Sequence, residues 1–388
     1  MRVLIINSMF YTSAYRRCAD ELGVQPEIDL TVLTVDGWIM NDRLSNTEAL
    51  SGNVPYPFII GKTLWKGKEN RGFYISGLRR AFHLSQPEII FLMEEPFSLF
   101  ALQVLFLKNL YSPNSKIVFF TWNNLSFSEF DYRPSVWYRM VSRWTLDRCD
   151  GALTANSDGI TVLGNTGFAK PIEKIGYGVR TDRFIEQDND RVEKLRAEIG
   201  ITPEQVIIGY VGRLLRMKGL DILLDAFASL DNPNLRLLIV GSGEFEQELM
   251  VLAERLGISD RIIHYPSVAH GDVPAYMQLI NIFVLPSRRY RMWAEQFGRV
   301  LVEAMAAGAI VIGSDSGAIP EVIGNAGFVF RENDVDSLRE ALNNALALDS
   351  NARSQLLSIG RERASKEHSW ERFATQAAAF LKRIRLSS

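Results

Sequence analysis

The sequence of 388 residues contains only two cysteines and four histidines, and it has no long apolar run. Cys18 and Cys149 lie in no CxxC pair and in no cysteine–histidine cluster, which excludes a disulfide framework and a zinc site of the usual spacing. The longest apolar stretch, 96–107, is shorter than the roughly 20 residues that a membrane-spanning helix needs. The N-terminal MRVLIINSMFY lacks a small-residue cleavage site, so it predicts a β-strand and not a signal peptide. We therefore expect a cytoplasmic protein without a spanning helix.

An excess of charge of one sign is also missing. The chain has 43 basic and 45 acidic residues, a net charge of −2. Proteins that bind nucleic acid usually carry a basic balance or stripe, so we expect no nucleic-acid partner. Hydrophobic residues make up 47% and charged residues 23%, which is typical of soluble globular domains and excludes a disordered chain. The length allows two or three such domains.

Short β-branched runs alternate with longer helical patterns, as in parallel sheets covered by crossover helices. The predicted fold class is α/β, with two doubly wound Rossmann-like domains that face each other across a cleft. Ligands of such sheets bind beyond the carboxyl ends of the strands. We expect domains at 1–175 and 176–365, and a last segment, 366–388, that crosses back to the first domain. The predicted strands are 2–8, 28–35, 88–93, 116–122 and 151–156, and then 206–212, 235–241, 261–266, 282–287 and 309–314.

The segment GRLLRMKG follows the first predicted strand of the second domain. Gly212 lets the backbone approach a ligand, and Arg213 and Lys218 place two cations before the N-terminus of a predicted helix. This combination indicates a diphosphate site, and the alternative is a solvated basic loop that caps a helix. The sequence contains neither GxxxxGK[ST] nor GxGxxG, so it predicts neither a Walker A loop nor a dinucleotide fingerprint.

A second candidate site lies in WAEQFGRVLVEAMAAG, where Glu295 precedes a predicted helix and Glu303 lies within it. Carboxylates accept hydrogen bonds from vicinal hydroxyls, which suits Glu295 to a sugar ring and Glu303 to a ribose. The residues between Glu295 and the helix offer backbone N–H groups to further hydroxyls or to a phosphate. The alternative is a solvent-facing Glu303 and a Glu295 that only complements the helix dipole. The residues with these N–H groups are Gln296, Phe297 and Gly298.

Together these segments resemble the retaining GT-B glycosyltransferases of family 4. The E-x7-E motif of that family matches EQFGRVLVE, and its phosphate-binding Arg and Lys match Arg213 and Lys218. The interdomain segment resembles KIGYGVRTDRF, the late Gly-rich loop resembles SDSGAIPEVIGNAGFVF, and the C-terminal Trp-helix resembles HSWERFA. The resemblance covers residues 174–388 by motif and the preceding part only by topology.

The resemblance implies transfer of a sugar from a nucleotide diphosphate donor, a UDP- or GDP-sugar, with retention of anomeric configuration, no cofactor and no obligatory metal. Arg213 and Lys218 would stabilise the leaving diphosphate in place of a divalent cation. Glu295 would orient the sugar and Glu303 the ribose, and the base would rest against backbone near Val268. No residue suggests itself as a nucleophile, so we favour front-face attack, with the leaving phosphate oxygen taking the acceptor proton.

The first half departs from the family at two places. Most members have a Gly-Gly turn after the first strand, where this chain reads NSMFYTSAYRRCADEL, so Ser8, Thr12 or Ser13 either contact the donor or belong to an ordinary polar loop. Asn123 stands where many members have a histidine. An amide can bind a hydroxyl but cannot titrate near neutrality, so Asn123 would position substrate and not act as a base. Glu95, beside Glu94 at the end of a predicted strand, either holds acceptor hydroxyls or caps the next helix.

In this family the first domain usually receives the acceptor. Residues 58–80 hold six basic residues and one acid, together with Trp65, and 132–148 sets Arg139 and Arg143 one turn apart among Trp137, Met140, Val141 and Trp144. Basic faces with interfacial aromatics suit an anionic bilayer or a lipid-diphosphate acceptor. We therefore predict a glycan or lipid-linked acceptor in polysaccharide or glycoconjugate synthesis, reached by peripheral contact with the inner face of a membrane. The alternative is that the aromatics pack in the core and the bases form a solvated rim.

Two rival functions stay open on the sequence alone. A nucleotide-sugar 2-epimerase shares the two-domain architecture, but it needs further acid and base groups in the cleft, and the motif order fits it poorly. A transferase-like, non-catalytic subunit would bind acceptor for a partner enzyme. The missing Gly-Gly turn and Asn123 favour this second rival, whereas the complete set of donor-site residues argues against it.

Overall fold

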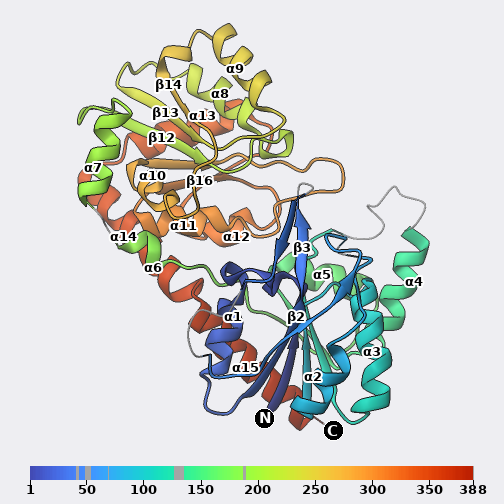
Figure 1. Ribbon diagram of the computed structural model, residues 1–388. Coiled ribbons are helices and arrows are strands. Elements are labelled where there is room, and N and C mark those ends of the chain that lie inside the picture. The colour runs from blue at the N-terminus through green and yellow to red at the C-terminus, as the bar shows by residue number, and fades with distance from the viewer. Residues whose placement is uncertain (41–42, 49–53, 69, 126–134, 187–188, 388) are drawn as a thin grey trace. The chain divides into compact units, whose positions relative to one another are not determined.

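A parallel sheet forms the centre of each of the two units into which the chain divides. The computed structural model describes residues 1–40, 43–48, 54–68, 70–125, 135–186 and 189–387 (Figure 1). Unit 1 consists of Met1–Gly178 with Trp370–Ser388, and unit 2 consists of Val179–Ser369. The chain thus leaves unit 1 between Gly178 and Val179, whereas the sequence analysis put this boundary between residues 175 and 176.

The sheet of unit 1 has seven parallel strands in the order β11-β10-β9-β8-β1-β2-β5. The fully buried strands have near-continuous apolar sequences such as RVLII and IIFL, which is expected where helices cover both faces of a sheet. The edge strands β5 and β11 are short and were not predicted from the sequence. The strands are β1 (Arg2–Ile6), β2 (Asp29–Val35), β5 (Phe58–Gly61), β8 (Ile89–Leu92), β9 (Lys116–Thr121), β10 (Gly151–Thr154) and β11 (Ile172–Lys174).

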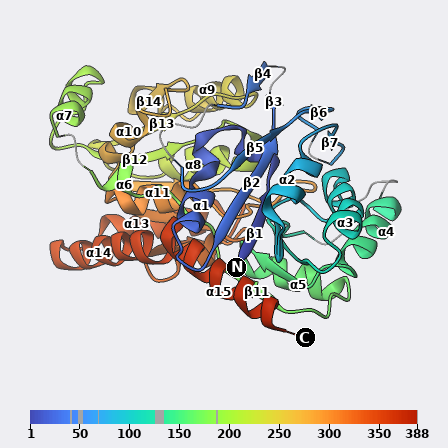
Figure 2. The same cartoon turned by 60° about the horizontal axis from the view of Figure 1, so that its bottom comes forward.

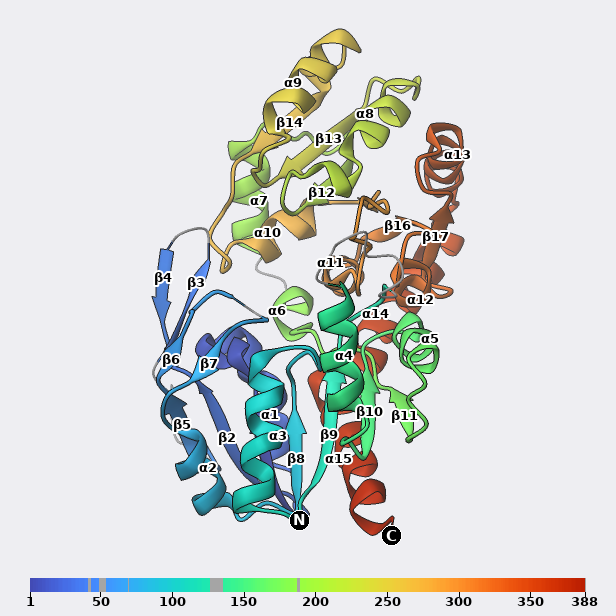
Figure 3. The ribbon, with the colours of Figure 1, turned by 90° about the vertical axis from the view of Figure 1, so that its right-hand side faces the viewer.

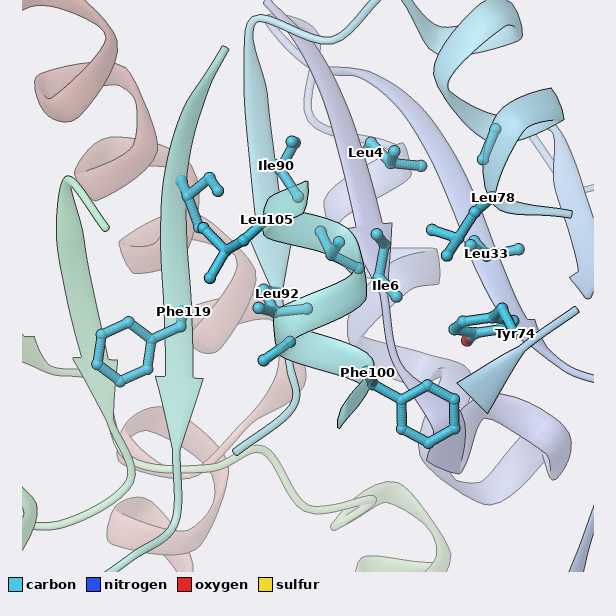
Figure 4. Packing of buried hydrophobic residues seen from close by; sticks show 14 of the residues in the cluster. Leu4, Ile6, Leu33, Tyr74, Leu78, Ile90, Leu92, Phe100, Leu105 and Phe119 are labelled. Carbon is cyan, nitrogen blue, oxygen red and sulfur yellow. The ribbon is translucent and has the colours of Figure 1, made fainter. Parts of the chain in front are cut away.

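Helices α2 and α3 bury their apolar sides against one face of this sheet. Figure 4 shows this layer, which contains Phe100 and Leu105 of α3 and Leu92 and Ile90 of the strands, and in which the Phe100 ring lies on the side of Tyr74. The layer contains aliphatic and aromatic side chains from each of these elements, and their burial is the main favourable contribution to folding. The helices of unit 1 before the crossing are η1 (Ser8–Tyr11), α1 (Ser13–Gly23), α2 (Leu78–Ser85), α3 (Leu99–Tyr111), α4 (Ser135–Leu146) and α5 (Ser157–Asn165).

Two small antiparallel hairpins extend unit 1 beyond the main sheet. One is formed by β3 (Gly37–Met40) and β4 (Arg43–Asn46), and the other by β6 (Thr63–Leu64) and β7 (Phe73–Tyr74). The region 58–80, which the sequence suggested as an acceptor loop, therefore contains the edge strand β5, the second hairpin and the start of α2.

The last helix, α15 (Trp370–Leu386), belongs to unit 1 and packs on α1 (Figure 2). Its apolar face is buried because alanines and aromatics recur at helical spacing, and Phe373 contacts Phe120 of β9 edge to face. Trp370 packs against Tyr177 with ring centroids 4.5 Å apart. The chain therefore returns to the first unit at Trp370.

Unit 2 has six parallel strands in the order β14-β13-β12-β15-β16-β17. In both units the strand order reverses beside the first strand, between β12 and β15 here and between β1 and β8 in unit 1. These are the switch points at which doubly wound sheets bind ligands. The strands are β12 (Val206–Val211), β13 (Leu235–Val240), β14 (Ile262–Tyr265), β15 (Ile282–Leu285), β16 (Ile310–Ser314) and β17 (Gly327–Phe330), of which the sequence analysis missed β17.

The helices of unit 2 follow the strands and cover both faces of the sheet. The charged stretch 182–200 contains two helices, α6 and α7. The helices are α6 (Asp182–Ile185), α7 (Asn189–Glu198), η3 (Arg216–Lys218), α8 (Leu220–Ala228), α9 (Glu246–Arg255), η4 (Ser259–Arg261), α10 (Val273–Leu279), α11 (Arg299–Ala307), α12 (Ile319–Ile323), α13 (Val335–Leu346) and α14 (Ser350–Glu367).

Candidate functional site

The strongest candidate site lies at the switch point of unit 2, where the loops after β12 and β15 meet. The loop after β12 carries Arg213, which is exposed and takes part in no ion pair with any residue that the structure describes. Tyr210 donates a hydrogen bond from its hydroxyl to the carbonyl of Arg213 at 2.9 Å, which fixes the backbone of the loop. Gly212 lies directly before it and donates its N–H to the Val240 carbonyl.

Lys218 is the last residue of the short helix η3, and it precedes Gly219, a position that has no room for a side chain. Gly219 has a φ of 66°, and a Cβ atom there would lie 2.0 Å from the carbonyl oxygen of Pro286. The loop after β12 therefore lies against the end of β15, since any side chain at this position would clash with backbone. This close approach brings Lys218 to the residues that follow β15.

Lys218 and Glu295 form an ion pair, with 2.6 Å between Nζ and Oε2. Their side chains are only 15% and 12% exposed, so water screens this pair less than a surface pair. The two residues were predicted to bind different parts of one ligand, the diphosphate and the sugar, and the structure brings their charged groups together. Each charge is thus compensated by the other in this structure.

Glu295 is fixed through its backbone as well as its carboxylate. Its carbonyl accepts a hydrogen bond from the Ala318 N–H at 2.9 Å, and a Cβ atom on Gly317 would lie 2.2 Å from that carbonyl oxygen. Gly317 has a φ of 55°, which a residue with a side chain rarely adopts. The Gly-rich segment after β16 therefore positions Glu295.

Two side chains that the sequence analysis did not select contact the ion pair. Ser287 donates its hydroxyl to Glu295 Oε2 at 2.9 Å, and the Lys218 ammonium lies 4.5 Å from the centre of the Trp293 ring. A cation over an indole face is attracted by the ring quadrupole. Both positions had a sequence signal: Ser287 lies at the predicted end of a strand at the switch point, and Trp293 lies two residues before Glu295.

Glu303 is buried on α11 and forms an ion pair with Arg299 one turn earlier, with 3.3 Å between the nitrogen Nε and Oε1. Burial raises the pKa of Glu303, and the guanidinium groups of Arg299 and Arg183 act in the opposite direction. The solvent-facing alternative is therefore wrong, because the side chain is not exposed. Arg183 also donates to the His270 carbonyl at 2.9 Å.

The remaining donor-side residues lie on α11, in the segment before it and in the loop after β14. Gly298 has a φ of 78° and is the N-cap residue of α11, which has no side-chain cap, and the buried Phe297 ring packs edge to face on His368. Gln296 is exposed and next to Glu295. Val268 is half-buried in the loop after β14. Gly308 ends α11 in the left-handed conformation, as the sequence predicted.

In unit 1, Glu95 and Asn123 meet at the ends of β8 and β9 through Thr121. The Thr121 hydroxyl donates to Glu95 Oε2 at 2.9 Å and accepts from the Asn123 N–H at 3.0 Å. Asn123 Oδ1 accepts from the N–H of Leu125, so it caps its own loop. The Glu95 carboxylate thus bonds groups at the end of β9, and no contact in the described chain joins either residue to Trp65.

Trp65 lies in the turn after β6, is 58% exposed and has a positive φ of 55°. Its neighbour Lys66 forms an ion pair with Asp36 at 2.8 Å. The exposure of Trp65 agrees with a surface role and excludes the alternative that this aromatic packs in the core.

Two carboxylates of unit 1 accept hydrogen bonds from the polar groups of the loop after β1. Ser8 donates both its N–H and its hydroxyl to the buried Glu94. Thr12 and Ser13 donate to the two oxygens of Glu48, at 2.9 and 2.6 Å. The structure thus places Ser8, Thr12 and Ser13 in a network within unit 1.

Within the described ranges, no group of three or more His, Cys, Asp or Glu residues could hold a metal ion. The same part of the chain has no helix that is both long enough and apolar enough to cross a bilayer.

Comparison with solved structures defines the class of fold. Over the full chain, the structure is similar to sucrose-phosphate synthase from Thermosynechococcus elongatus, with a TM-score of 0.75, 20% identity and coverage of 100% of this chain and 99% of the other. It is similar to HepE from Anabaena in complex with UDP, with a TM-score of 0.73, 18% identity and coverage of 99% and 100%. The predicted GT-B fold, with a Rossmann-like domain in each unit, is confirmed.

The family match lies within unit 2, where residues 191–363 match the family described as "Glycosyl transferases group 1". Over 223 residues it is 32% identical to the GDP-mannose-dependent alpha-(1-6)-phosphatidylinositol monomannoside mannosyltransferase of Mycobacterium tuberculosis, covering 56% of this chain and 57% of that protein. It is 29% identical to the D-inositol 3-phosphate glycosyltransferase of Mycobacterium ulcerans, covering 58% and 49%. The match thus spans about half the length of these curated relatives.

Proposed function

We propose that the protein is a retaining glycosyltransferase that moves a sugar from a UDP- or GDP-sugar to a glycan or lipid-linked acceptor. The observation that carries this proposal is the Lys218–Glu295 pair at the switch point of unit 2. A nucleotide diphosphate sugar offers a phosphate to Lys218 and hydroxyls to Glu295, so it satisfies both groups when they separate. The names of similar proteins support both nucleotides, because one is called GDP-mannose-dependent and another was solved with UDP.

The residues of unit 2 would divide the donor between them. Arg213 and Lys218 would bind the diphosphate, aided by the N-termini of α8 and α11, which have no side-chain cap among the described residues. Glu303 would accept from the ribose once Arg299 moves away. The half-buried loop at Val268 would hold the base, and the backbone of 296–298 would bind further hydroxyls.

Transfer with retention would occur by front-face attack. The acceptor hydroxyl oxygen forms a bond to the anomeric carbon while the bond from that carbon to the diphosphate oxygen breaks on the same face. The hydroxyl proton goes to the leaving phosphate oxygen, so no protein base is required. Arg213 and Lys218 stabilise the negative charge that develops on the diphosphate, which is the role of a divalent cation in metal-dependent transferases.

Unit 1 would bind the acceptor, with Glu95 and Asn123 at the ends of its central strands and Trp65 on its surface. The amide of Asn123 would orient an acceptor hydroxyl and cannot remove its proton at neutral pH. This assignment leaves proton removal to the donor phosphate.

Helix α4 supports peripheral contact with an anionic membrane. Val136, Met140 and Trp144 recur at four-residue spacing and are 55%, 63% and 38% exposed. Exposed arginines flank this stripe, and Arg148 lies 4.0 Å from the Trp144 ring centre. Helix α3 lies beside α4 (Figure 3) and exposes Phe106 and Leu110. Apolar side chains between cations are typical of helices that lie in a bilayer interface.

The exposed stripe differs from the set that the sequence suggested. Val141 is buried, so it belongs to the core and not to this stripe. The side chain of Trp137 lies outside the described part of the structure. Met140 and Trp144 are exposed, so for these two the interpretation as core residues is wrong.

A thermal-shift screen with UDP, GDP, ADP and dTDP and their sugars tests the proposed donor. We expect stabilisation by one nucleotide and its sugar, followed by transfer to an acceptor in a product assay. Absence of binding by every nucleotide would contradict the proposal. Release of free epimerised sugar without acceptor would indicate the epimerase, and nucleotide-independent acceptor binding would indicate the non-catalytic subunit. Sedimentation with anionic vesicles at low salt tests membrane contact separately.

A further inference from the structure

A second cavity in unit 2 lies beside the Lys218–Glu295 pair and shares one side chain, Trp293, with it. The cavity has a volume of about 580 Å³, which is within the range of sites for small molecules, about 300–1,000 Å³. Its walls come from η3, from the start of α9 and from the segment after β15. The proposed donor residues Arg213, Glu295 and Glu303 do not line it.

One wall is a tight hairpin with a strained backbone. Tyr290 and Trp293 exchange two backbone hydrogen bonds of 3.0 and 3.1 Å, and Arg291 between them has a φ of 52°. A left-handed conformation is unfavourable for a residue with a side chain. Such strain is often found at ligand sites, because the surrounding structure holds the residue in place. The hairpin presents both aromatic side chains to the cavity.

The charges that line the cavity balance. Arg216 donates to Glu248 Oε2 at 2.6 Å, so these two neutralise each other. Arg291 and Glu244 form no ion pair with described residues, and together they offer the cavity one cationic donor and one anionic acceptor. A phosphate would meet two carboxylates, and a cation would meet two guanidinium groups. The lining therefore disfavours an ion of either sign.

This combination of side chains suits a neutral molecule that has both hydroxyl groups and an apolar face. The rings of Tyr290 and Trp293 line the cavity, each with one cation over it: the Arg291 guanidinium lies 5.3 Å from the Tyr290 ring centre and the Lys218 ammonium 4.5 Å from that of Trp293. The ring surface that these cations leave uncovered is apolar, the Glu244 carboxylate accepts from hydroxyls and the Arg291 guanidinium donates to them. Carbohydrates have this chemistry, since C–H groups form one face of a sugar ring and hydroxyls surround it.

We propose that this cavity is a carbohydrate subsite that binds one or two sugar units of the acceptor glycan next to the donor site. That the bound sugar belongs to the acceptor rests on the proposed function, whereas binding of carbohydrate does not. Because Trp293 lines the cavity and lies over the Lys218 ammonium, a sugar held here also restrains a side chain beside the diphosphate site.

Calorimetric titration of the full chain with α-mannotriose tests the subsite, because similar curated proteins are named as mannosyltransferases. We expect Glu244→Ala and Tyr290→Ala each to raise the Kd for the trisaccharide at least fivefold. Both should leave the affinity for the preferred nucleotide diphosphate within twofold of the wild type. Glu254→Ala, an exposed glutamate on the same helix as Glu248, is the matched control and should change neither affinity.

The same variants test the link to transfer. Glu244→Ala should raise KM for a trisaccharide acceptor at least fivefold and leave both kcat and KM for a monosaccharide acceptor unchanged. Equal trisaccharide binding by wild type and both variants, absence of binding by the wild type, or loss of nucleotide binding in Glu244→Ala would each overturn the subsite. Mannotriose binding that depends on Glu244, in a protein that binds no nucleotide, would instead remove the proposed function and keep the subsite.

Discussion

Apart from the additional edge strand β11 in unit 1, the two units have the same strand order, but different contacts join the loops at their switch points. In unit 1, a buried carboxylate after β8, Glu94, binds the backbone N–H and the hydroxyl of Ser8 after β1. In unit 2, the corresponding loops meet through two side chains of opposite charge, Lys218 and Glu295. A ligand cannot replace Glu94 without leaving a buried charge unpaired, which is costly. In contrast, a ligand with an anionic group and hydroxyls can separate the pair in unit 2.

The starts of the helices show the same difference. Glu48 binds the N–H of Ser13, so α1 has a carboxylate of its own chain at its N-terminus. Helices α8 and α11 begin at Gly219 and Gly298, and neither has a side-chain cap among the described residues. Helix N-termini attract anions through unpaired N–H groups and the helix dipole. Among the described residues, the start of α1 in unit 1 is thus bonded by a carboxylate, whereas the starts of α8 and α11 in unit 2 have no side-chain cap.

Lys218→Met should have the largest effect, because it removes the positive charge of the Lys218–Glu295 ion pair. We expect transfer to fall by about 10²–10³, the usual cost of losing one group that stabilises developing charge. The affinity for the nucleotide diphosphate should fall as well, since the same cation binds the ground state. Initial rates with saturating acceptor and calorimetry with UDP or GDP measure both effects. Lys366→Met, on the exposed face of α14, is the control, and wild-type turnover in Lys218→Met would contradict the assigned role.

Glu295→Gln should distinguish the role of Glu295 from that of Lys218 in their ion pair. The amide can still accept from Ser287, but it no longer neutralises Lys218, so the nucleotide diphosphate should bind about three- to tenfold more tightly. Transfer should nevertheless fall strongly, because the carboxylate that orients the sugar is lost. Calorimetry with UDP or GDP beside a transfer assay distinguishes the two effects. Weaker nucleotide binding in this variant would show that the pair does not compete with the ligand.

Glu303→Gln tests the buried carboxylate of α11 through its pH dependence. Burial raises the pKa of Glu303, so the carboxylate becomes protonated at a higher pH than an ordinary glutamate as the pH falls. We expect wild-type nucleotide affinity to decrease as the pH falls through this raised pKa. The affinity of the variant should be about fivefold weaker at neutral pH and nearly constant over the same range. Parallel pH profiles of the two proteins would contradict a role for Glu303 in ribose binding.

The contribution of Glu303 to folding stability should decrease as the pH rises, whereas its contribution to nucleotide affinity should increase. A glutamate whose folded pKa lies above its unfolded pKa contributes stability below the unfolded pKa, and this is lost as the pH rises through the folded value. Glu303→Gln should therefore unfold at a higher temperature than the wild type at pH 8, with a smaller difference at acidic pH. Thermal unfolding at both pH values measures this effect without any ligand.

Local patterns were sufficient to predict most of the central strands and the order of the motifs. Strands such as Arg2–Ile6 and Ile310–Ser314 are apolar on both faces, so they stand out in the sequence. The short strands β5, β11 and β17 could not be recognised this way, because tertiary pairing with a neighbour stabilises segments of three or four residues. Helix α4 was misjudged at Val141, which is buried, because spacing alone does not say which apolar face meets the core.

The candidate site was predictable as a set of residues but not as a geometry. The motifs identified Lys218 and Glu295, which lie 77 positions apart, as candidate site residues. Only the fold shows that their side chains form an ion pair. Ser287 and Trp293 lie outside the recognised motif, and their role depends on contacts across the switch point. The hydrogen bond that Glu48 accepts from the Ser13 N–H could not be predicted either, because Glu48 lies 35 residues further along the sequence.

The smallest expected effect comes from Glu48→Gln, which alters the helix start in unit 1. The Ser13 hydrogen bonds lower the pKa of Glu48, with further contributions from Thr12 and Arg16, so the carboxylate stabilises the folded state above its unfolded pKa and loses this effect as the pH falls. Because Glu48 is half-exposed, we expect a loss of only about 0.5–1 kcal/mol in the free energy of unfolding at pH 7. The difference from wild type should shrink below about pH 4.

Urea unfolding at pH 7 and pH 4 measures this difference, with the exposed Glu27→Gln as the matched control. Nucleotide affinity should stay unchanged in Glu48→Gln, because that carboxylate already occupies the N-terminus of α1. A variant that gained affinity for the nucleotide diphosphate would show that Glu48 keeps an anion out of unit 1.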